Sequence, residues 1–434
     1  MKFTIKGGYL VDPLAGKEGF YDLLIEDGFV KGLAPCLPAG EGPVLDLKGK
    51  AILPGLVDMH CHLREPGFTY KEDIASGSAA AVAGGFTAVA CMPNTEPVLD
   101  NEETIAFVLE KARKVNLARV IPFGALTEKQ QGKKLAPLEK LAEAGCRGFS
   151  DDGRPVANAS LVYQALQKLH ELALPVISHC EDPDLAAGGV AHLSSQMQKK
   201  GLPGIPVAAE SIMVARDIQL ARETGGWVHI AHVSAASSVS LIAAARANGI
   251  RVTAEVTPHH LLLSQEDVFP EQPNTKVNPP LRDLSDRQAL QQALQERIID
   301  IIATDHAPHA PFEKEKDFLT APFGMIGLET ALPLLLTMSS RQGWPSLREL
   351  VLYLSARPAQ LLKLKAGTLQ PGYPADLTVV DLKRRGIIKA DCFHSKSMNS
   401  PFLGWEYEGK PCLTMVQGQI KMLEGKVGEN IPLP

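Results

Sequence analysis

The sequence predicts a mixed α/β protein: a (β/α)8 TIM-like barrel with a small β domain built from both chain ends. Eight apolar, often β-branched runs alternate with helix-like segments over about 250 residues, which is the size of such a barrel. Both ends of the chain instead resemble short strands separated by turns. Five of the eight runs also end in histidine or aspartate, and a barrel brings such ends together at one mouth.

The eight predicted strands are separated by segments with apolar residues at helical spacing, for example residues 101–116 and 208–224. An open doubly wound sheet is the alternative, but it usually has fewer strands and needs a glycine-rich phosphate turn, which we do not find. The predicted strands cover residues 55–63, 86–93, 118–126, 145–152, 175–181, 226–234, 251–258 and 299–308.

The two ends of the chain share a texture of short strands and turns. The N-terminal end contains FTIKGGYLVD and YDLLIEDGFVKGL, and the C-terminal end contains AGTLQPGYPADLTVVDL and PCLTMVQGQIKML. We therefore predict three segments. Residues 1–50 form the N-terminal part of the β domain, residues 51–365 the (β/α)8 barrel, and residues 366–434 the C-terminal part of the β domain.

The composition argues against several classes of partner. The chain has 44 Lys+Arg and 49 Asp+Glu, a net charge of −5, and no basic block that would favour nucleic acid or a membrane surface. The longest apolar runs, such as 331–336, are too short to cross a bilayer, and the N-terminus lacks the apolar core of a signal peptide. Seven cysteines without a Cys-x-x-Cys pair indicate reduced thiols and a cytoplasmic protein.

The first predicted strand ends in GLVDMHCHLREPG (55–67), with histidines at alternate positions. On a regular strand His60 and His62 point to one face and Cys61 to the other. Two neighbouring imidazoles suit a metal ion, although two surface histidines at the end of an edge strand would give the same pattern. The other strand ends favour the metal. They carry Asp151 and Asp152 (fourth), His179 (fifth), His232 (sixth) and Asp305 (eighth).

This set of residues predicts the chemistry of the site. Four histidines and two carboxylates are too many for one tetrahedral ion with an open position, and indicate two adjacent ions. Nitrogen and carboxylate ligands suit Zn²⁺, with Co²⁺, Mn²⁺ or Ni²⁺ as substitutes. Such ions lower the pKa of bound water and polarise a carbonyl group. We therefore expect hydrolysis of an amide-like bond, or its reversal.

The remaining histidines are interpreted as structural or supporting. His229 lies three residues before His232, and His306 lies next to Asp305, so strand alternation would send both to the opposite face. His259 and His260 end the seventh run, and we assign them a supporting role. Three further histidines fall in helical, loop or C-terminal segments: His170, His192 and His394.

The ordered motifs resemble the amidohydrolase superfamily and, within it, the bacterial type I dihydroorotases. The resemblance implies reversible zinc-dependent cyclisation of N-carbamoyl-L-aspartate to L-dihydroorotate, a step of de novo pyrimidine biosynthesis. The reverse reaction is the hydrolysis of a cyclic amide. The motifs that carry it are DMHCHLREPG, CMPNT (91–95), SDDG (150–153), VNPPLR (277–282), TDHAPH (304–309) and, in the C-terminal segment, PGYPADLTVVD.

The resemblance also implies roles for the metal ligands. His60, His62 and Asp305 would hold one zinc ion, and His179 and His232 the other. Many relatives bridge the ions with a carboxylated lysine on the fourth strand, but residues 145–153 contain no lysine. We therefore expect Asp152 and a hydroxide as the bridges, with Asp151 as the alternative. Asp305 would also be catalytic, as the base that shuttles the proton.

Other residues would select the substrate. Arg64 offers a planar fork for the carboxylate of dihydroorotate, which hydantoin and allantoin rings lack, and Asn94 can donate to the same group. A solvated loop arginine is the alternative for Arg64. The resemblance adds these substrate contacts: His62, Leu63, Asn278, His309, Phe323 and Gly324.

The segment 310–327 has a charged first half and a glycine-flanked end, which favours a mobile lid, although a plain surface loop fits as well. Two alternatives to the dihydroorotase stay open. One is another cyclic-amide hydrolase, such as an allantoinase or a hydantoinase. The other is an inactive structural partner of aspartate transcarbamoylase. For the active enzyme we expect a small-molecule substrate and a homo-oligomer, and association with aspartate transcarbamoylase stays open.

Overall fold

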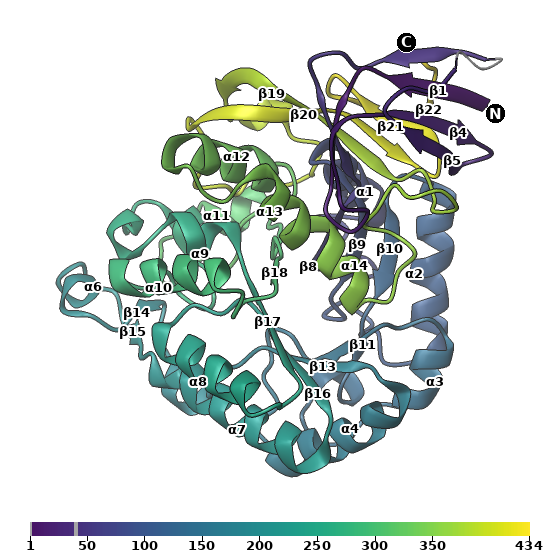
Figure 1. The fold of residues 1–434 in the computed structure, drawn as a ribbon. Coiled ribbons are helices and arrows are strands. Elements are labelled where there is room, and N and C mark those ends of the chain that lie inside the picture. Colours follow the sequence, from purple (N-terminus) through teal and green to yellow (C-terminus); the bar gives the residue numbers. More distant parts are fainter. Residues whose placement is uncertain (1, 39–41) are drawn as a thin grey trace.

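The computed structural model describes residues 2–38 and 42–434 (Figure 1). Residues 1 and 39–41, which belong to the predicted N-terminal segment, lie outside the described part of the chain. Each of the eight predicted runs contains a strand, and the third run holds two strands separated by Phe123. The strands are β8 (Leu56–Cys61), β9 (Phe86–Cys91), β10 (Arg119–Pro122), β11 (Gly124–Ala125), β12 (Phe149–Ser150), β13 (Pro175–Ser178), β16 (Trp227–Ile230), β17 (Val252–Val256) and β18 (Ile301–Ile302).

These strands pair in parallel and in chain order. One series runs β8, β9, β10, and a second runs from β11 through β12, β13, β16 and β17 to β18. The two series join because only Phe123 separates β10 from β11. Just after β18, His306 forms a parallel bridge with Cys61, and His62 N donates to His306 O at 2.8 Å. Parallel pairing therefore leads from β8 to β18 and returns to β8.

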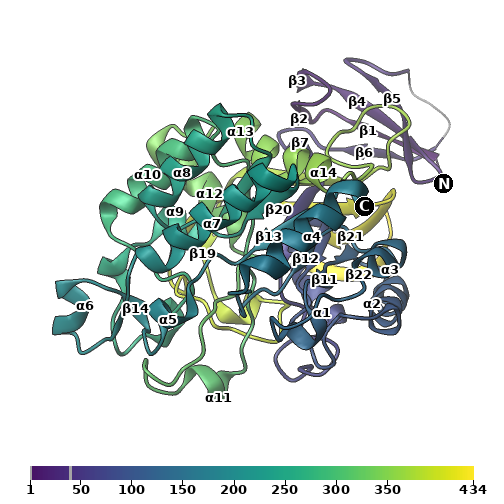
Figure 2. The same cartoon turned by 90° about the horizontal axis from the view of Figure 1, so that it is seen from below.

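Helices occupy the segments between the strands (Figure 2), and the longer ones contact one another in the order α1, α2, α3, α4, α7, α8 and α10. Their ends follow local sequence: Asn101 caps α2 by accepting from Thr104 N at 3.0 Å, and Asn116 ends it with a left-handed φ of 49°. No helix in the described residues has the length and apolar character needed to cross a membrane. The longer helices are α1 (Ile74–Ala83), α2 (Glu102–Val115), α3 (Leu138–Glu143), α4 (Ala159–Leu172), α7 (Ala208–Thr224), α8 (Ala236–Ala247), α10 (Leu284–Gln295) and α12 (Ala331–Gln342).

Shorter elements decorate the loops between the strands and helices. The segment after β13 holds a small parallel pair of strands, β14 (Ala191–His192) and β15 (Gly204–Ile205). The short helices are α5 (Pro183–Ala186), α6 (Ser195–Lys199), α9 (Pro258–Leu262), α11 (Pro311–Lys314), α13 (Leu347–Val351) and α14 (Arg357–Leu361).

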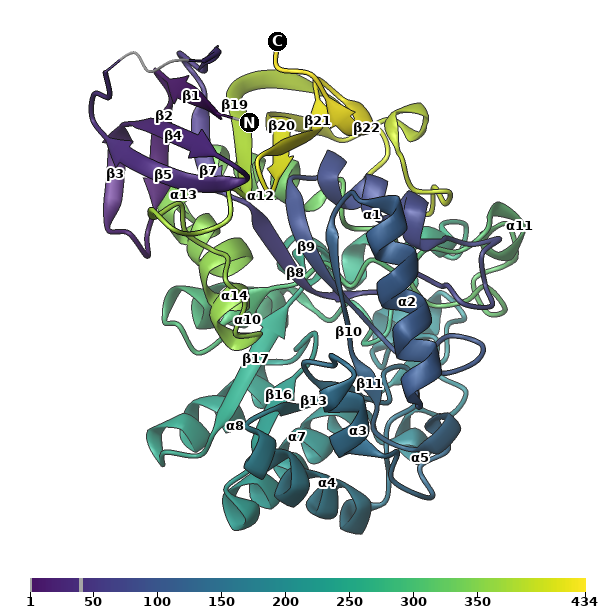
Figure 3. The ribbon, with the colours of Figure 1, turned by 90° about the vertical axis from the view of Figure 1, so that its right-hand side faces the viewer.

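The chain ends form two further sheets, of which the larger contains strands from both ends and the smaller contains N-terminal strands alone (Figure 3). The smaller sheet has the order β5 (Phe29–Ala34), β4 (Asp22–Glu26), β1 (Lys2–Lys6) and β6 (Val44–Asp46). The larger has the order β22 (Lys426–Ile431), β21 (Gln419–Leu423), β20 (Glu406–Val416), β19 (Leu377–Ile387), β7 (Ala51–Pro54), β2 (Tyr9–Asp12) and β3 (Lys17–Phe20). A separate buried cluster combines residues of both ends, including Phe3, Ile52, Leu377 and Met415. Although the predicted N-terminal segment stops at residue 50, β7 also lies in this larger sheet.

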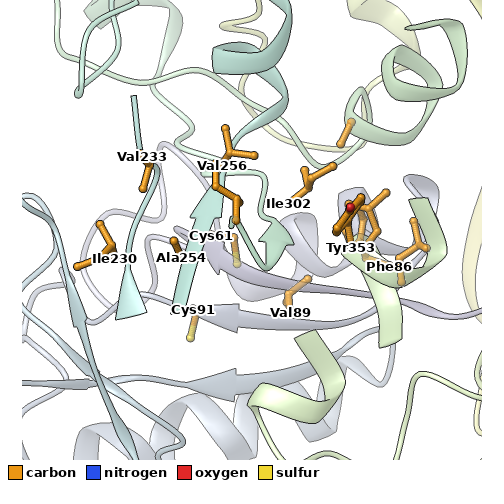
Figure 4. Packing of buried hydrophobic residues seen from close by; sticks show 14 of the residues in the cluster. Cys61, Phe86, Val89, Cys91, Ile230, Val233, Ala254, Val256, Ile302 and Tyr353 are labelled. Carbon is orange, nitrogen blue, oxygen red and sulfur yellow. The ribbon is translucent and has the colours of Figure 1, made fainter. Parts of the chain in front are cut away.

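The strands of the middle are buried on both faces, as parallel strands between helices usually are. On β9, Val89 and Cys91 pack in the main hydrophobic cluster with residues of the surrounding helices (Figure 4). Ala88 and Ala90, which alternate with them, belong to a second cluster. This double burial fixes the strands, so the residues that follow their C-terminal ends are held in place by a rigid scaffold.

Candidate metal centre

The end of β8 brings His60 and His62 together. Their ring centroids are 5.5 Å apart, whereas Cys61 packs in the main hydrophobic cluster. Asp305, which follows β18, faces both rings: its Oδ1 lies 3.1 Å from His62 Nε2 and 3.5 Å from His60 Nε2. Two imidazoles and a carboxylate arranged in this way form a group that can hold a metal ion.

Asp152 lies between this group and a second pair of histidines. Its Oδ1 is 3.4 Å from His60 Nε2, and its Oδ2 is 3.5 Å from His62 Nε2. The same Oδ1 lies 3.5 Å from His179 Nδ1 and 3.6 Å from His232 Nε2, and these two nitrogens are 2.8 Å apart. The structure thus brings together all six residues that the sequence analysis assigns as ligands.

Asp151 points elsewhere. Its Oδ1 accepts from Leu126 N at 2.8 Å and from Thr127 N at 3.0 Å, and its Oδ2 accepts from the Thr127 hydroxyl. Burial raises the pKa of Asp151 to about 6, although these hydrogen bonds oppose the shift. The neighbouring carboxylates therefore have different surroundings: Asp152 faces four imidazoles, and Asp151 ties β12 to the segment after β11.

The donor set fits divalent metal ions. Three buried atoms of the cluster have no hydrogen-bond partner among the described residues: His60 Nε2, Asp152 Oδ1 and His232 Nδ1. An unpaired buried polar atom ordinarily costs about 1–3 kcal/mol. Imidazole nitrogens and carboxylate oxygens are ligands of Zn²⁺ and related ions, which would satisfy such atoms.

Three residues around this cluster adopt a left-handed backbone. The φ angles are 58° at Arg64, 32° at His232 and 46° at Asp305. Such conformations cost a residue with a side chain about 1–3 kcal/mol and gather at active sites, where packing enforces them. Each of these residues follows the end of a strand, so the backbone turns sharply just where it delivers its side chain.

Arg64 and Asn94 both border the cluster. The Arg64 Nε donates to Pro308 O at 3.2 Å, and no described residue accepts from its two terminal nitrogens. Asn94 Oδ1 lies 2.9 Å from His62 Nδ1, so the amide oxygen accepts a hydrogen bond from the Nδ1–H of His62. The other ring nitrogen of His62, Nε2, then faces Asp305. Asn94 Nδ2 is 3.5 Å from Asp152 O. The fork of Arg64 thus stays open for a ligand, while Asn94 already orients His62.

The other predicted substrate contacts have mixed surroundings. Asn278 Nδ2 is 3.5 Å from His179 Nε2, and its buried Oδ1 lacks a partner among the described residues. His309 Nε2 donates to Phe323 O at 2.8 Å, and burial together with Arg64 lowers the pKa of His309 to about 2. Leu63 differs, because its side chain packs into the hydrophobic cluster and only its backbone remains for a ligand.

The segment 310–327 is tied down at several points. Lys314 is buried, and its Nζ donates to Pro322 O and Gly324 O, both at 2.9 Å. Glu313 pairs with Lys71 at 2.8 Å. Gly324 has a φ of 127°, and a Cβ there would lie 2.8 Å from the Cβ of Ala307, so a side chain would not fit. These contacts hold the segment against Lys71 and against Ala307, which lies two residues after Asp305.

The predicted orientation of His229 was wrong, although its side chain contacts none of the proposed ligands among the described residues. Strand alternation predicts opposite faces for His229 and His232, but β16 ends at Ile230 and His232 has already left the strand. Both residues contact Glu255: His229 Nε2 lies 3.1 Å from its Oε2, and His232 N donates to its Oε1 at 3.2 Å. Sequence reasoning missed Glu255. The available signal was a charged residue inside the apolar run 251–258.

Other histidines have partners of their own. His306 Nε2 lies 3.3 Å from Glu72 Oε2. His260 Nε2 donates to Pro279 O at 3.0 Å. His192 lies 3.3 Å from Arg282, and His394 pairs with Glu329 at 3.1 Å. His192 also lies near two aspartates, Asp283 and Asp286, but these two cap and anchor backbone N–H groups.

Comparison with known proteins identifies the family. A family model described as dihydro-orotase-like matches residues 49–238. The chain is 46% identical over 424 residues to a dihydroorotase of Syntrophus aciditrophicus, covering 97% of this chain and 99% of the relative. It is 48% identical over 422 residues to a dihydroorotase of Pelotomaculum thermopropionicum, with the same coverage. The chain belongs to the dihydroorotase family.

Solved structures show which other proteins share the fold of this dihydroorotase family member. The L-hydantoinase (dihydropyrimidinase) of Arthrobacter aurescens superposes with a TM-score of 0.87 at 27% identity, covering 98% of this chain and 97% of the other. The D-hydantoinase (dihydropyrimidinase) of a Thermus species gives 0.82 at 26% identity, covering 98% and 96%. Cyclic-amide hydrolases with other names therefore have nearly the same architecture.

Proposed function

We propose that this protein is a dihydroorotase that interconverts N-carbamoyl-L-aspartate and L-dihydroorotate, the ring-closing step of pyrimidine biosynthesis. The observation that carries the proposal is the convergence of four histidines and two aspartates beside the open fork of Arg64. The dihydroorotases that match nearly the whole chain support the same activity. No ligand of the expected set is missing, which argues against an inactive structural relative.

The metal assignment follows from the same distances. His60, His62 and Asp305 would hold one zinc ion and His179 and His232 a second, and Asp152, whose carboxylate lies near the imidazoles of both pairs, would contribute to both. No carboxylated lysine is expected, because residues 145–153 contain no lysine. When bound, such ions lower the pKa of water and polarise the carbonyl group under attack.

The side chains of the protein would bind the substrate and move its proton. Asp305 would act as the base in hydrolysis and return the proton to the ring nitrogen, and it reverses this role in cyclisation. Arg64 and Asn94 would bind the substrate carboxylate through charge-assisted and amide hydrogen bonds. The further contacts would come from His62, the backbone of Leu63, Asn278, His309, Phe323 and Gly324. Closure of the segment 310–327 would exclude water.

The fold that we propose for the middle of the chain is a closed (β/α)8 barrel. The parallel pairing from β8 to β18 and back supports this closure. The larger sheet and the buried cluster that both chain ends share support a separate β domain. The proposed divisions are residues 1–50, 51–365 and 366–434. All seven cysteines are free, which suits the expected cytoplasmic location. Homo-oligomerisation and association with aspartate transcarbamoylase stay predictions.

Metal removal tests the function directly. The purified protein should contain zinc, two ions per chain at full occupancy, and hydrolyse dihydroorotate. Treatment with a chelator should abolish the activity, and added Zn²⁺ should restore it, because the water nucleophile and the carbonyl both depend on the ions. The measurements are elemental analysis and the dihydroorotate assay on the same samples. Full activity in protein shown to be free of metal would contradict the proposal.

Alanine substitutions of the two neighbouring aspartates should have different effects, one on zinc binding and the other on stability. Asp152→Ala should lose zinc, because its carboxylate lies within 3.6 Å of four imidazoles. Asp151→Ala should keep most of its zinc but unfold at a lower temperature. It leaves Thr127 N without its acceptor, which costs about 1–3 kcal/mol, and leaves Leu126 N only its longer bond to Ser150 O at 3.3 Å. Zinc content and Tm of both variants test this, and the reverse ranking of zinc loss would assign the bridge to Asp151.

A further inference from the structure

A row of hydrogen-bonded polar side chains leads to the proposed metal centre. Trp227 and His229 are alternate residues of β16, and Thr253 and Glu255 are alternate residues of β17. The two strands are paired, with His229 directly opposite Thr253. Alternate residues of a strand share a face, so all four side chains lie on one side of this pair. His229 and Glu255 are fully buried.

Hydrogen bonds connect these side chains into one line that ends at His60. Trp227 Nε1 donates to Thr253 Oγ1 at 2.8 Å, and Thr253 Oγ1 lies 2.8 Å from His229 Nδ1. His229 Nε2 lies 3.1 Å from Glu255 Oε2. Glu255 Oε1 lies 2.6 Å from His60 Nδ1. No step in this line is longer than an ordinary hydrogen bond.

The chemistry of the two ends fixes the direction of every bond. An indole N–H can only donate, so Thr253 Oγ1 accepts from Trp227, and in neutral His229 a proton on Nε2 leaves Nδ1 to accept from the Thr253 hydroxyl. His229 then carries its proton on Nε2 and donates it to Glu255. An ionised carboxylate can only accept, so the proton of His60 is on Nδ1. In neutral His60 the lone pair is then on Nε2, the nitrogen that faces Asp152 and Asp305.

The same carboxylate also reaches the other half of the centre. Glu255 Oε1 accepts from the backbone N–H of His232 at 3.2 Å, at the position where φ is 32°. One buried glutamate thus contacts a histidine assigned to the first ion and a histidine assigned to the second. A carboxylate in this position orients its imidazole and raises the basicity of the ligand nitrogen.

We propose that Glu255, held in place by His229, is a positioning residue of the metal centre. It fixes the tautomer and orientation of His60 and the backbone of His232, so that the two ion positions keep a constant relative geometry. This inference rests on the proposed function, because it presupposes that the histidines bind metal. A role in stability alone is the competing explanation, since a buried polar network also satisfies its own hydrogen bonds.

Zinc affinity separates the two explanations. We would titrate wild type, Glu255→Gln and His229→Gln with Zn²⁺ in competition with a chromophoric chelator, and record the Tm of the metal-free proteins. Glu255→Gln keeps the shape but loses the charge, and its affinity for zinc should fall about ten- to a hundredfold. Residue 229 contacts no proposed ligand side chain, so His229→Gln should lower the affinity for zinc by a smaller factor.

Glu72→Gln is the matched control. Glu72 is equally buried, and its Oε2 lies 3.3 Å from His306 Nε2, but it contacts none of the proposed ligands. This variant should lose stability without losing zinc affinity. An affinity of folded Glu255→Gln within twofold of wild type, or equal weakening by Glu72→Gln, would overturn the inference. If Glu255→Gln does not fold, unchanged zinc affinity in His229→Gln overturns it instead.

The wild-type protein distinguishes this inference from the proposed function. If wild type binds no zinc and leaves dihydroorotate intact, the proposed function fails. If wild type binds zinc and turns over dihydroorotate, but the affinity is insensitive to residues 229 and 255, only the positioning role fails.

Discussion

Asp305→Asn should lower kcat by about a hundredfold or more and leave the fold intact. Asp305 Oδ1 faces the Nε2 atoms of both His62 and His60, at 3.1 Å and 3.5 Å, and so lies at the proposed metal centre. In the proposed reaction its carboxylate carries a proton between the nucleophile and the nitrogen of the substrate ring. Asparagine keeps the size and one oxygen of the side chain, but its amide cannot accept and return a proton. The measurement is kcat in both directions, with the zinc content and Tm of the variant.

Asp300→Asn provides the control for this substitution. Asp300 precedes the other end of β18, where its carboxylate accepts from Ala254 N at 2.9 Å and pairs with Arg246 at 3.1 Å. Residues at the N-terminal ends of barrel strands contribute to stability and not to chemistry. This variant should keep its kcat. A near-normal kcat in Asp305→Asn would remove Asp305 from the proton-transfer role.

Arg64→Met should lose about ten- to more than a hundredfold in kcat/KM for dihydroorotate, the equivalent of roughly 1.5–3 kcal/mol for a charged hydrogen bond. Its Nε is already bound to Pro308 O, which aims the rest of the fork away from the backbone. Arg64→Lys should recover part of the loss, because a point charge cannot reproduce a bidentate fork. Neither replacement is branched at Cβ, so the φ of 58° adds no new strain.

The uncharged ring is the control for Arg64. Dihydrouracil lacks the carboxylate, so it should be a poor substrate of wild type, and Arg64→Met should not weaken it further. Zinc content should be equal in wild type and variant. If wild type prefers dihydrouracil, or the substitution slows both rings equally, the protein acts as a hydantoinase-like enzyme. The similarity to solved hydantoinase structures makes this comparison the sharpest test of the substrate.

Sequence reasoning anticipated the residues that follow strand ends. Each predicted run contains a strand, and the runs are short, largely apolar and often β-branched, a pattern typical of strands buried on both faces. Histidine and aspartate at the ends of such runs then share one location, the edge where the carboxyl ends of the parallel strands meet. The choice between Asp151 and Asp152 stayed open, because it depends on where the backbone of β12 stops, and β12 ends at Ser150.

The errors arose where the backbone stops being regular. Alternation places His229 opposite His232 only if the strand continues, and the turn at residues 231–232 breaks that count. Glu255 escaped notice for a related reason, since a single carboxylate in an apolar run has no motif. Its partners come from two other strands, β8 and β16. Contacts of this kind depend on three-dimensional closure, which local periodicity does not encode.

The sheet shared by both chain ends has a consequence for biosynthesis. The side-chain hydroxyl of Thr368 donates to Asp12, although 356 residues separate them, and β7 pairs with β19 directly before β8 begins. During translation the first strands therefore emerge long before their C-terminal neighbours exist. Until then one edge of β7 stays unpaired, and edges of this kind recruit foreign strands. The segment that leads directly into β8, the strand that carries His60, therefore gains its second neighbour only when β19 emerges, so a chain truncated before β19 should expose this edge and aggregate more readily.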